Sequence, residues 1–378
     1  MQGPVAIIHT QIGPYHLARI RAFRALYSGS VHLLQLASQE AQRQWTVDAA
    51  AAEITTVAQG TLEKLSPQAV SRQLIQCLTQ INPAVIVVAG YSQPAMRVAT
   101  HWARQHHTPT ILLSDSQMLD HPRNLVKESL KGWWICRHFD AAFVAGASAA
   151  HYLSQLGFPR DRIWRSYDVV DNFHFAQGAA TTRASADELR RQLGLSNPYF
   201  LYVGRFSPEK NLFRLLVAYQ LYSQQAGFNA WSLVLLGSGP QQDKLQRQAA
   251  QLQLRNVFWF SFKQVDELPM YYGLASALIL PSISEPWGLV VNEAMACGVP
   301  ILISDRCGCI PDLVFPGING WIFNPLLIAN ISKAMLRISA IPEHQLVSMG
   351  TASKRIIANY TPDIWAQALK DCVQTLVD

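Results

Sequence analysis

The sequence lacks a long hydrophobic run and carries few charges. Of its 378 residues, 15% are charged and 49% are hydrophobic, yet no stretch of about 18 consecutive apolar residues occurs. We therefore expect no membrane-spanning helix. The first residues show no basic segment followed by an apolar one, so we also expect no signal peptide. The abundance of apolar residues excludes a disordered chain and predicts extensive buried sheet.

Cysteines are few, and their spacing does not indicate a metal site. The six cysteines include no C-x-x-C pair. Cys307 and Cys309 lack the second pair or nearby histidine that a zinc site needs. We expect no metal and reduced, mostly buried thiols, which favour a cytoplasmic protein.

Basic residues exceed acidic residues without clustering. The net charge is +6, which suits a phosphorylated small molecule, an anionic membrane surface or a nucleic acid. No block of about five or more basic residues occurs, so we expect no nucleic-acid partner.

Short apolar runs alternate with helical patterns along the whole chain. A single core stops growing before this length, so we expect two domains. Continuous apolar runs separated by helices indicate parallel strands buried on both faces, and hence two doubly wound, Rossmann-like α/β domains. The expected strands are Val5–His9, Val31–Leu36, Val85–Ala89, Thr110–Leu113 and Ala141–Ala145, then Tyr199–Val203, Leu233–Leu236, Val257–Phe260, Ala277–Leu280 and Ile301–Ser304.

A small, polar segment marks the expected domain boundary. Gln177–Thr182 predicts a linker, and a charged helix over Ser185–Leu193 follows it. We expect a first domain over residues 1–180, a second over 181–355, and a helix over 356–378 that packs back on the first domain. Two such domains facing each other would form a cleft, with ligands beyond the carboxyl ends of the strands.

Two cations follow the first expected strand of the second half. Gly204 ends that strand, and Arg205 offers a planar fork for phosphate oxygens. Lys210 lies near the start of a helix, whose free N–H groups favour an anion. These features predict a diphosphate clamp. A surface turn with solvated charges is the alternative.

A pair of glycines follows the next strand. Gly237 and Gly239 permit a tight turn into a helix, but the third glycine and the acidic residue of a dinucleotide site are absent. A dehydrogenase is therefore disfavoured. Gly237 is either a nucleotide contact or part of a plain connecting turn.

Two carboxylates lie around a later turn and helix. Glu285 follows the strand that ends at Leu280, and Glu293 lies one to two turns into a helix expected from about Leu289 to Gly298. Carboxylates accept hydrogen bonds from vicinal hydroxyls, so the pair suits a sugar and a ribose. Alternatively, Glu285 caps the helix and Glu293 faces solvent, which the apolar neighbours of Glu293 disfavour.

The segments 204–211 and 281–300 together resemble family 4 of the retaining glycosyltransferases, which has the two-domain GT-B fold. The spacing from Glu285 to Glu293 and the order of Arg205 and Lys210 carry the resemblance, and Gly317–Trp321 is similar to the family's closing turn and strand. The resemblance covers residues 199–325 well and the first half more loosely. It implies two doubly wound domains that face each other across a cleft.

The resemblance implies roles for these residues. Arg205 and Lys210 would bind the donor diphosphate and act in catalysis with Glu285, which would contact the transferred sugar. Glu293 would bind the ribose. The family usually needs no metal, in agreement with the absence of a D-x-D triplet, and we expect no cofactor. The other implied donor-binding residues are Gly13, Gly204, Gly237, Trp287, Gly288 and Leu289.

The same resemblance implies that the first half of the chain binds the acceptor. Gly13 lies where members of the family have a glycine-containing loop after the first strand, although their usual double glycine is missing here. His16 is an acceptor contact or only a histidine at a helix start. Asp115 and Ser116 occupy the place where many relatives carry a histidine, and His121 comes later. Asp115 would orient the acceptor hydroxyl or cap the next helix.

Lys127–His138 mixes basic and aromatic residues. Basic amphipathic segments can dock on an anionic membrane, and the relatives often act on lipid-linked acceptors. The favoured alternative is an ordinary domain helix with Trp133 or Trp134 in the core.

The residues and the resemblance together predict a retaining glycosyltransferase in the cytoplasm, peripheral at most to the inner face of a membrane. It would move a hexose-type sugar from a nucleotide-sugar donor, UDP- or GDP-linked, to a hydroxyl of a glycan, lipid or small-molecule acceptor. One alternative is a nucleotide-sugar epimerase or hydrolase that uses His16 and Asp115 as its acid/base pair. Another is a non-catalytic nucleotide-sugar-binding protein. Turnover of a donor would separate the transferase from a pure binding protein.

Overall fold

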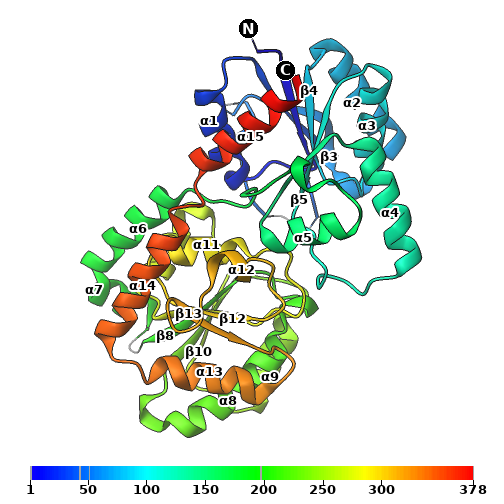
Figure 1. Ribbon diagram of the computed structural model, residues 1–378. Coiled ribbons are helices and arrows are strands. Elements are labelled where there is room, and N and C mark those ends of the chain that lie inside the picture. Colours follow the sequence, from blue (N-terminus) through cyan, green and yellow to red (C-terminus); the bar gives the residue numbers. More distant parts are fainter. Residues whose placement is uncertain (1, 42–43, 51, 196–197, 378) are drawn as a thin grey trace. The chain divides into compact units, whose positions relative to one another are not determined.

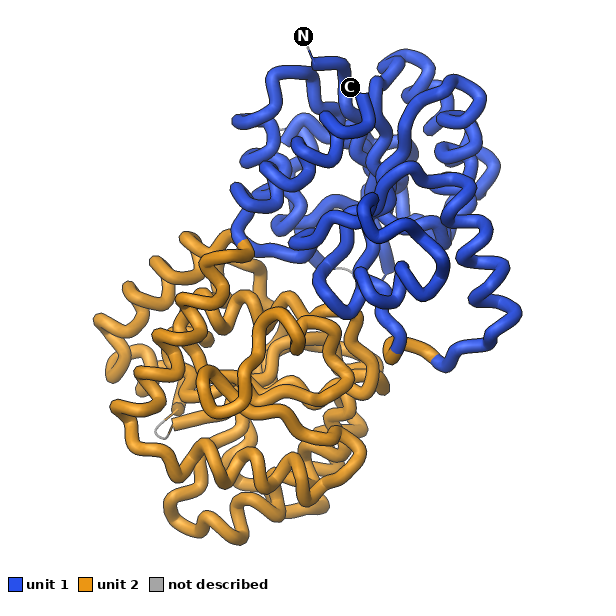
Figure 2. Tube along the Cα trace, viewed as in Figure 1, with its two compact units in different colours: residues 1–118, 122–170, 361–378 blue, residues 119–121, 171–360 orange. Residues whose placement is uncertain are grey.

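The computed structural model describes residues 2–41, 44–50, 52–195 and 198–377. Contacts within the chain divide it into two compact units, which Figure 2 shows in different colours. Unit 1 comprises residues 1–118, 122–170 and 361–378, and unit 2 comprises residues 119–121 and 171–360. Each unit is built around one sheet of parallel strands (Figure 1).

Unit 1 contains a seven-stranded sheet of order β3-β2-β1-β4-β5-β6-β7. Its strands are β1 (Val5–His9), β2 (Val31–Gln39), β3 (Ile54–Thr61), β4 (Val85–Ala89), β5 (Thr110–Ser114), β6 (Ala141–Val144) and β7 (Ile163–Trp164). Its helices are α1 (Pro14–Leu26), α2 (Pro67–Ile81), α3 (Pro94–Gln105), α4 (Leu125–His138), α5 (Ala147–Gln155) and α15 (Pro362–Val377).

Unit 2 contains a six-stranded sheet of order β10-β9-β8-β11-β12-β13. Its strands are β8 (Tyr199–Val203), β9 (Ser232–Leu236), β10 (Val257–Phe260), β11 (Ala277–Leu280), β12 (Ile301–Ser304) and β13 (Gly320–Phe323). Its helices are α6 (Asn172–Ala184), α7 (Ala186–Leu193), α8 (Leu212–Ala226), α9 (Gln242–Gln251), α10 (Leu268–Leu274), α11 (Leu289–Ala296), α12 (Ile310–Leu313), α13 (Ile328–Ser339) and α14 (Glu343–Ile357).

Every apolar run expected to form a strand does so, and the predicted fold class is confirmed. The paired strands of both sheets run parallel. All residues of β1, β8 and β9 are buried. Burial on both faces explains why these strands read as continuous apolar runs rather than as alternating ones.

The division of the chain lies at residue 170 rather than near residue 180. The segment Gln177–Thr182, expected to be a linker, is the middle of helix α6. Its small residues serve close packing: a Cβ added to Gly178 would lie 2.5 Å from the Pro269 side chain on α10, and one added to Gly273 would lie 2.9 Å from Thr182. Small side chains therefore indicate a tight contact between two helices here, not a flexible connection.

The last helix, α15, belongs to unit 1. It packs against α1, and Trp365 is 1% exposed. The Trp365 ring centroid lies 5.7 Å from that of Phe143 on β6 and 6.2 Å from that of Phe23 on α1. The C-terminal segment thus completes the core of unit 1.

The connection between β2 and β3 is unusual for parallel strands. Parallel neighbours are normally joined through a helix, but the described residues of 40–53 form no helix or strand. Strand β3 itself was not predicted, because its sequence, ITTVAQGT, is polar and only Val57 is fully buried within it. This crossover forms one wall of a cavity in unit 1.

Candidate functional site

Two turns meet at the carboxyl ends of the neighbouring strands β8 and β11. One is residues 204–211, which include a short 3-10 helix, Pro208–Lys210, and the other is residues 281–288. The Ile283 amide donates to the Glu209 carbonyl at 2.8 Å. Asn211, in the left-handed conformation with φ of 61°, donates through Nδ2 to the Pro281 carbonyl at 3.1 Å. These two hydrogen bonds, one from a backbone amide and one from the Asn211 side chain, hold the two turns together.

Lys210 and Glu285 face each other across these turns. Lys210 Nζ lies 2.5 Å from Glu285 Oε2, and their side chains are 16% and 11% exposed. Ser282 donates a further hydrogen bond, 3.1 Å long, to the same carboxylate oxygen. A mostly buried ion pair is stable only when its remaining polar atoms are also bonded, and Ser282 contributes to that here.

Arg205 lies on the exposed side of the same turn. Its guanidinium donates to Glu209 Oε1 at 3.1 Å, and its side chain is 49% exposed. Burial tends to raise the pKa of Glu209, but the hydrogen bond from Ser207 and the charge of Arg205 outweigh it and hold that pKa below its usual range. Arg205 and Lys210 thus both pair with glutamates, and both lie in the turn after the carboxyl end of β8, the end of a strand where ligands of such sheets bind.

Glu293 is buried, not solvent-facing. It is 1% exposed on α11, and Tyr272 Oη donates to its Oε2 at 2.6 Å. A carboxylate removed from water is strongly disfavoured without hydrogen-bond donors. Tyr272, on α10, was missed from the sequence, because nothing in the local pattern of α10 distinguishes it from its buried neighbour Tyr271.

The turn after Glu285 leads into helix α11. Gly288, and not Glu285, is its N-cap residue, with φ of 104°. The Trp287 indole is buried and donates to Asn292 Oδ1 at 2.9 Å. Its side chain therefore braces the turn. Leu289 is the first helical residue and is partly exposed.

Gly237 and Gly204 have a packing role. A Cβ on Gly237 would lie 2.0 Å from the Gly204 carbonyl oxygen, and Gly237 has φ of 145°. The Gly204 amide in turn donates to the Leu236 carbonyl at 3.0 Å. The two glycines let the turns after β8 and β9 touch, which positions Arg205.

In unit 1, Gly13 and His16 form the start of α1. The Gly13 amide donates to His16 Nδ1 at 2.8 Å, so the ring proton lies on Nε2. The space beside Gly13 is filled by an aromatic side chain: a Cβ there would lie 2.5 Å from Trp45 Cε3. Trp45, in the crossover after β2, was not predicted, because it lies outside every expected strand and helix.

Asp115 and Ser116 follow β5. Asp115 is exposed and Ser116 is partly exposed, and the Ser116 amide donates to Ser114 Oγ at 3.3 Å. Asp115 does not cap the next helix, because Asn124 caps α4 by accepting from the Lys127 amide at 3.1 Å. The acceptor role of Asp115 and Ser116 stays a prediction.

Helix α4 carries apolar side chains on its solvent face. Trp133 is 62% exposed, and Leu130 and Val126, one and two turns earlier, are 62% and 69% exposed. The expectation that Trp133 or Trp134 lies in the core is wrong for Trp133, and Trp134 is only partly buried. The face directed inward consists instead of Gly132 and Ile135, because Gly132 packs against the Leu156 backbone.

The described residues show neither a group of three or more potential metal ligands nor a helix that is long and apolar enough to cross a membrane. Four of the six cysteines are buried, whereas Cys77 is partly exposed and Cys136 is exposed. Burial raises the pKa of Cys307, so its thiol is poorly suited to hold a metal as thiolate.

Comparison with known proteins gives the site its context. Residues 185–355, which contain Arg205, Lys210, Glu285 and Glu293, match the family model of glycosyl transferases group 1. An uncharacterized glycosyltransferase of Methanocaldococcus jannaschii is 34% identical over 45% of this chain and 44% of its own length. The O-antigen chain mannosyltransferase B of Escherichia coli is 31% identical over 37% of this chain and 36% of its own length. The chain thus aligns with less than half the length of these relatives.

Solved structures resemble the chain over its whole length. The complex of Anabaena Alr3699/HepE with UDP and glucose aligns with a TM-score of 0.76 at 16% identity, over 99% of this chain and 100% of the other. Sucrose-phosphate synthase from Thermosynechococcus elongatus aligns with a TM-score of 0.78 at 18% identity, over 100% and 99%. The chain therefore has the GT-B fold, and its residues 185–355 carry the sequence pattern of glycosyl transferases group 1.

Proposed function

We propose that this protein is a retaining glycosyltransferase that moves a sugar from a nucleotide-diphosphate sugar to an acceptor hydroxyl. The observation that carries the proposal is the pairing of Lys210 with Glu285, beside Arg205, within the part of the chain that matches the family model. Two cations and a carboxylate at one strand edge suit a diphosphate joined to a hydroxyl-rich sugar. The UDP and glucose bound by Anabaena Alr3699/HepE support a donor of this class.

In the proposed donor complex, Lys210 and Arg205 exchange their glutamate partners for phosphate oxygens. Glu285 is then available to accept hydrogen bonds from the sugar hydroxyls. Glu293 would accept hydrogen bonds from the ribose hydroxyls. The amides of Gly288 and Leu289 begin helix α11, and their partial positive charge favours the phosphates.

In the proposed transfer, the acceptor oxygen bonds to the anomeric carbon as the bond from that carbon to the phosphate oxygen breaks. The departing phosphate takes the hydroxyl proton on the same face, which retains the anomeric configuration. Arg205 and Lys210 stabilise the charge that develops on the diphosphate. Because these cations serve the leaving group, we propose that the reaction needs neither metal nor cofactor. Undiminished turnover with a chelator is the expected result.

The acceptor is proposed to bind unit 1 near His16, Asp115 and Ser116. His16 Nε2 carries the ring proton, as its Nδ1 bond requires, and so can donate to an acceptor oxygen. Asp115 can accept from an acceptor hydroxyl.

Helix α4 supports a contact with an anionic lipid surface, on the cytoplasmic side of a membrane. Its exposed apolar stripe of Val126, Leu130 and Trp133 lies beside the exposed cations Lys127 and Arg137. The Arg137 guanidinium carbon lies 5.8 Å from the centre of the Trp133 ring. An apolar stripe next to cations is the pattern by which helices lie in a lipid interface.

Incubation of the protein with UDP- and GDP-sugars and a mixed panel of glycan, lipid and small-molecule acceptors tests the activity. We expect a glycosidic product whose anomeric configuration, read by NMR, is that of the donor. Free sugar or an epimerised nucleotide sugar formed without acceptor would instead indicate a hydrolase or epimerase. Binding of the donor without any turnover would indicate a non-catalytic binding protein.

A further inference from the structure

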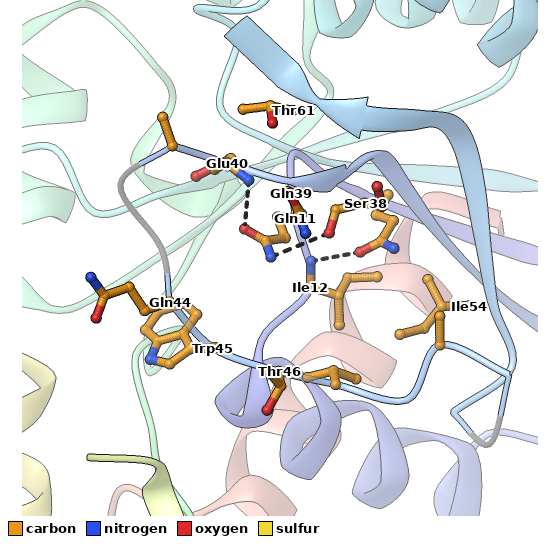
Figure 3. Close-up of a pocket in the computed structure, with 14 residues that line it drawn as sticks. Gln11, Ile12, Ser38, Gln39, Glu40, Gln44, Trp45, Thr46, Ile54 and Thr61 are labelled. Atoms are coloured by element: carbon orange, nitrogen blue, oxygen red, sulfur yellow. Dashed lines mark hydrogen bonds between the residues drawn. The ribbon is translucent and has the colours of Figure 1, made fainter. Parts of the chain in front are cut away.

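Unit 1 contains a cavity of about 480 Å³ that none of the predicted site residues lines. It lies among the residues that follow β1, the end of β2 and the crossover to β3 (Figure 3). A volume of this size falls in the range of small-molecule sites. Trp45, which fills the space beside Gly13, is one of its lining residues.

The cavity exists because the crossover is not a helix. A helix in this position would normally cover the sheet face with apolar side chains. The described part of residues 40–53 forms an irregular segment instead, and the sheet face beside it bears the polar side chain of Gln35. Long connections without secondary structure are uncommon in compact domains and are often functional.

One wall of the cavity is fixed by buried amides. Gln35 is 5% exposed, accepts from the Ile12 amide at 3.1 Å and donates to Thr56 Oγ1 at 2.9 Å. Gln11 is also 5% exposed and accepts from the Glu40 amide at 3.0 Å. Two buried side chains that bind the backbone of neighbouring loops hold the wall in place, so the cavity is preformed.

The remaining lining is almost free of charge and mixes polar groups with the apolar side chains of Ile12, Ala41, Val47, Ala49 and Ile54. Ser38, Gln39, Thr46 and Thr61 contribute hydroxyl and amide groups, and among the described lining residues Glu40 is the only one with a charged side chain. No lysine or arginine of the described chain lines the cavity. A phosphate or carboxylate would meet no cation there and would be repelled by Glu40.

Trp45 adds an apolar surface on the crossover side, away from Ser38 and Gln39 (Figure 3). Its ring is anchored at one edge by Gly13 and meets Tyr15 edge-on, with centroids 5.8 Å apart. A pyranose ring has the matching character, because its C–H groups form apolar patches and its hydroxyls form a polar rim.

We propose that this cavity binds a neutral, hydroxyl-rich sugar unit of the acceptor, packed against Trp45, and that it discriminates against phosphorylated and carboxylated sugars. The inference rests on the proposed function and narrows its acceptor to a neutral glycan. Gln39 would donate hydrogen bonds to the sugar hydroxyls and accept from them, Glu40 would accept from them, and Trp45 would set the plane of the ring.

The test uses the whole protein with two kinds of probe. Saturation-transfer NMR measures binding of maltose, cellobiose, lactose and mannobiose, with glucose 6-phosphate and glucuronate as anionic comparisons. We expect the protein to bind at least one neutral disaccharide and neither anion. Trp45→Ala should weaken that binding by about tenfold or more, whereas Trp45→Phe, which keeps an aromatic surface, should restore most of it.

A second measurement separates this inference from the proposed function. Thermal shift with UDP and GDP reports the donor site in unit 2, and we expect it to be unchanged in Trp45→Ala. Preference for the anions, neutral-sugar binding that survives Trp45→Ala, or no binding of any neutral probe would overturn the assignment of the cavity. Neutral-sugar binding that depends on Trp45, in a protein that never binds or turns over a donor, would support the cavity and refute the transferase.

Discussion

Lys210 Nζ and Glu285 Oε2 lie 2.5 Å apart, although 75 positions separate the two residues in the sequence. Each follows a strand, and the strands β8 and β11 are paired neighbours. Parallel sheets bring the ends of such strands to one edge, so a cation and a carboxylate from distant segments form one site. The pair keeps both groups in place and leaves each able to exchange its partner for a ligand.

Glu293 should contact the ribose, which the response to deoxynucleotides would reveal. We expect the wild-type protein to bind 2′-deoxy-UDP about tenfold less tightly than UDP, or 2′-deoxy-GDP less tightly than GDP, because a buried carboxylate loses its donor. In Glu293→Gln this preference should shrink. Calorimetric titration of the four nucleotides gives the comparison.

Tyr272→Phe is the matched variant for that experiment. It removes the hydroxyl that donates to Glu293 and leaves the ring in its buried place. It should destabilise the fold by about 1 kcal/mol yet preserve the preference for ribose over deoxyribose. An equal deoxy penalty in wild type and Glu293→Gln would remove Glu293 from the donor site.

The hydrogen bond from Ser207 and the charge of Arg205 lower the pKa of Glu209, so its contribution to stability should depend on pH in the acidic range. The pKa of Glu209 is lower in the folded protein than its ordinary value of 4.5, so the unfolded chain binds its proton more tightly. The stabilisation by Glu209 is therefore present above that ordinary pKa and is lost as the pH falls through the folded value.

The measurement is the free energy of unfolding of wild type and Glu209→Gln over a pH series. The difference between the two proteins should be constant near neutrality and should shrink on acidification below the ordinary pKa. A difference that stays the same at all pH values would show that the carboxylate charge of Glu209 does not stabilise the fold.

The architecture could be read from the sequence because its strands are buried on both faces. Runs such as Val5–His9 and Tyr199–Val203 are strands with the expected bounds. Strand β3 was not predicted because it is the edge strand of its sheet and most of its residues are only partly buried, which permits a polar sequence. Residues 177–182 were wrongly predicted to be a linker, because small side chains suit both a linker and a tight contact between helices. Only the helix that packs against them, α10, distinguishes the two.

The sequence predicted only those site residues that belong to a recognisable motif. Arg205, Lys210 and Glu285 follow strands within a recognisable pattern, and the structure brings them together. Asn211, Tyr272 and Trp45 act through contacts with distant segments. An asparagine directly after a lysine at a helix start was the one local signal available for Asn211, since asparagine tolerates the left-handed conformation.

Gly237 should be intolerant of any side chain. Gly237→Ala places a methyl group 2.0 Å from the Gly204 carbonyl oxygen at a φ of 145°, so we expect a loss of about 3 kcal/mol or more in unfolding free energy. Gly194→Ala is the control. Gly194 also has a positive φ, of 68°, and lies in the left-handed region, but no atom lies within 4 Å of the added methyl, and the cost should be about 1 kcal/mol. Equal losses in chemical denaturation would contradict the packing role of Gly237.

Helix α4 should bind anionic membranes through its apolar stripe. We expect the protein to sediment with vesicles of phosphatidylglycerol and phosphatidylcholine but less with phosphatidylcholine alone. The double variant Leu130→Ser, Trp133→Ser should bind about tenfold more weakly. Phe228→Ser, which changes a fully exposed aromatic residue of unit 2, should bind like wild type. Sedimentation that is unaffected by the double variant would place the lipid contact elsewhere.

Donor binding by the wild-type protein and Lys210→Ala tests the central claim most directly. Titration calorimetry with UDP- and GDP-sugars, without added metal, should show binding of one nucleotide class to the wild type. Lys210→Ala should weaken it by at least about tenfold, or about 1.4 kcal/mol, while Lys244→Ala, an exposed lysine on α9, should leave it unchanged. Tight binding that persists in Lys210→Ala, or no binding of either class to the wild type, would contradict the assignment of this site to a nucleotide-sugar donor.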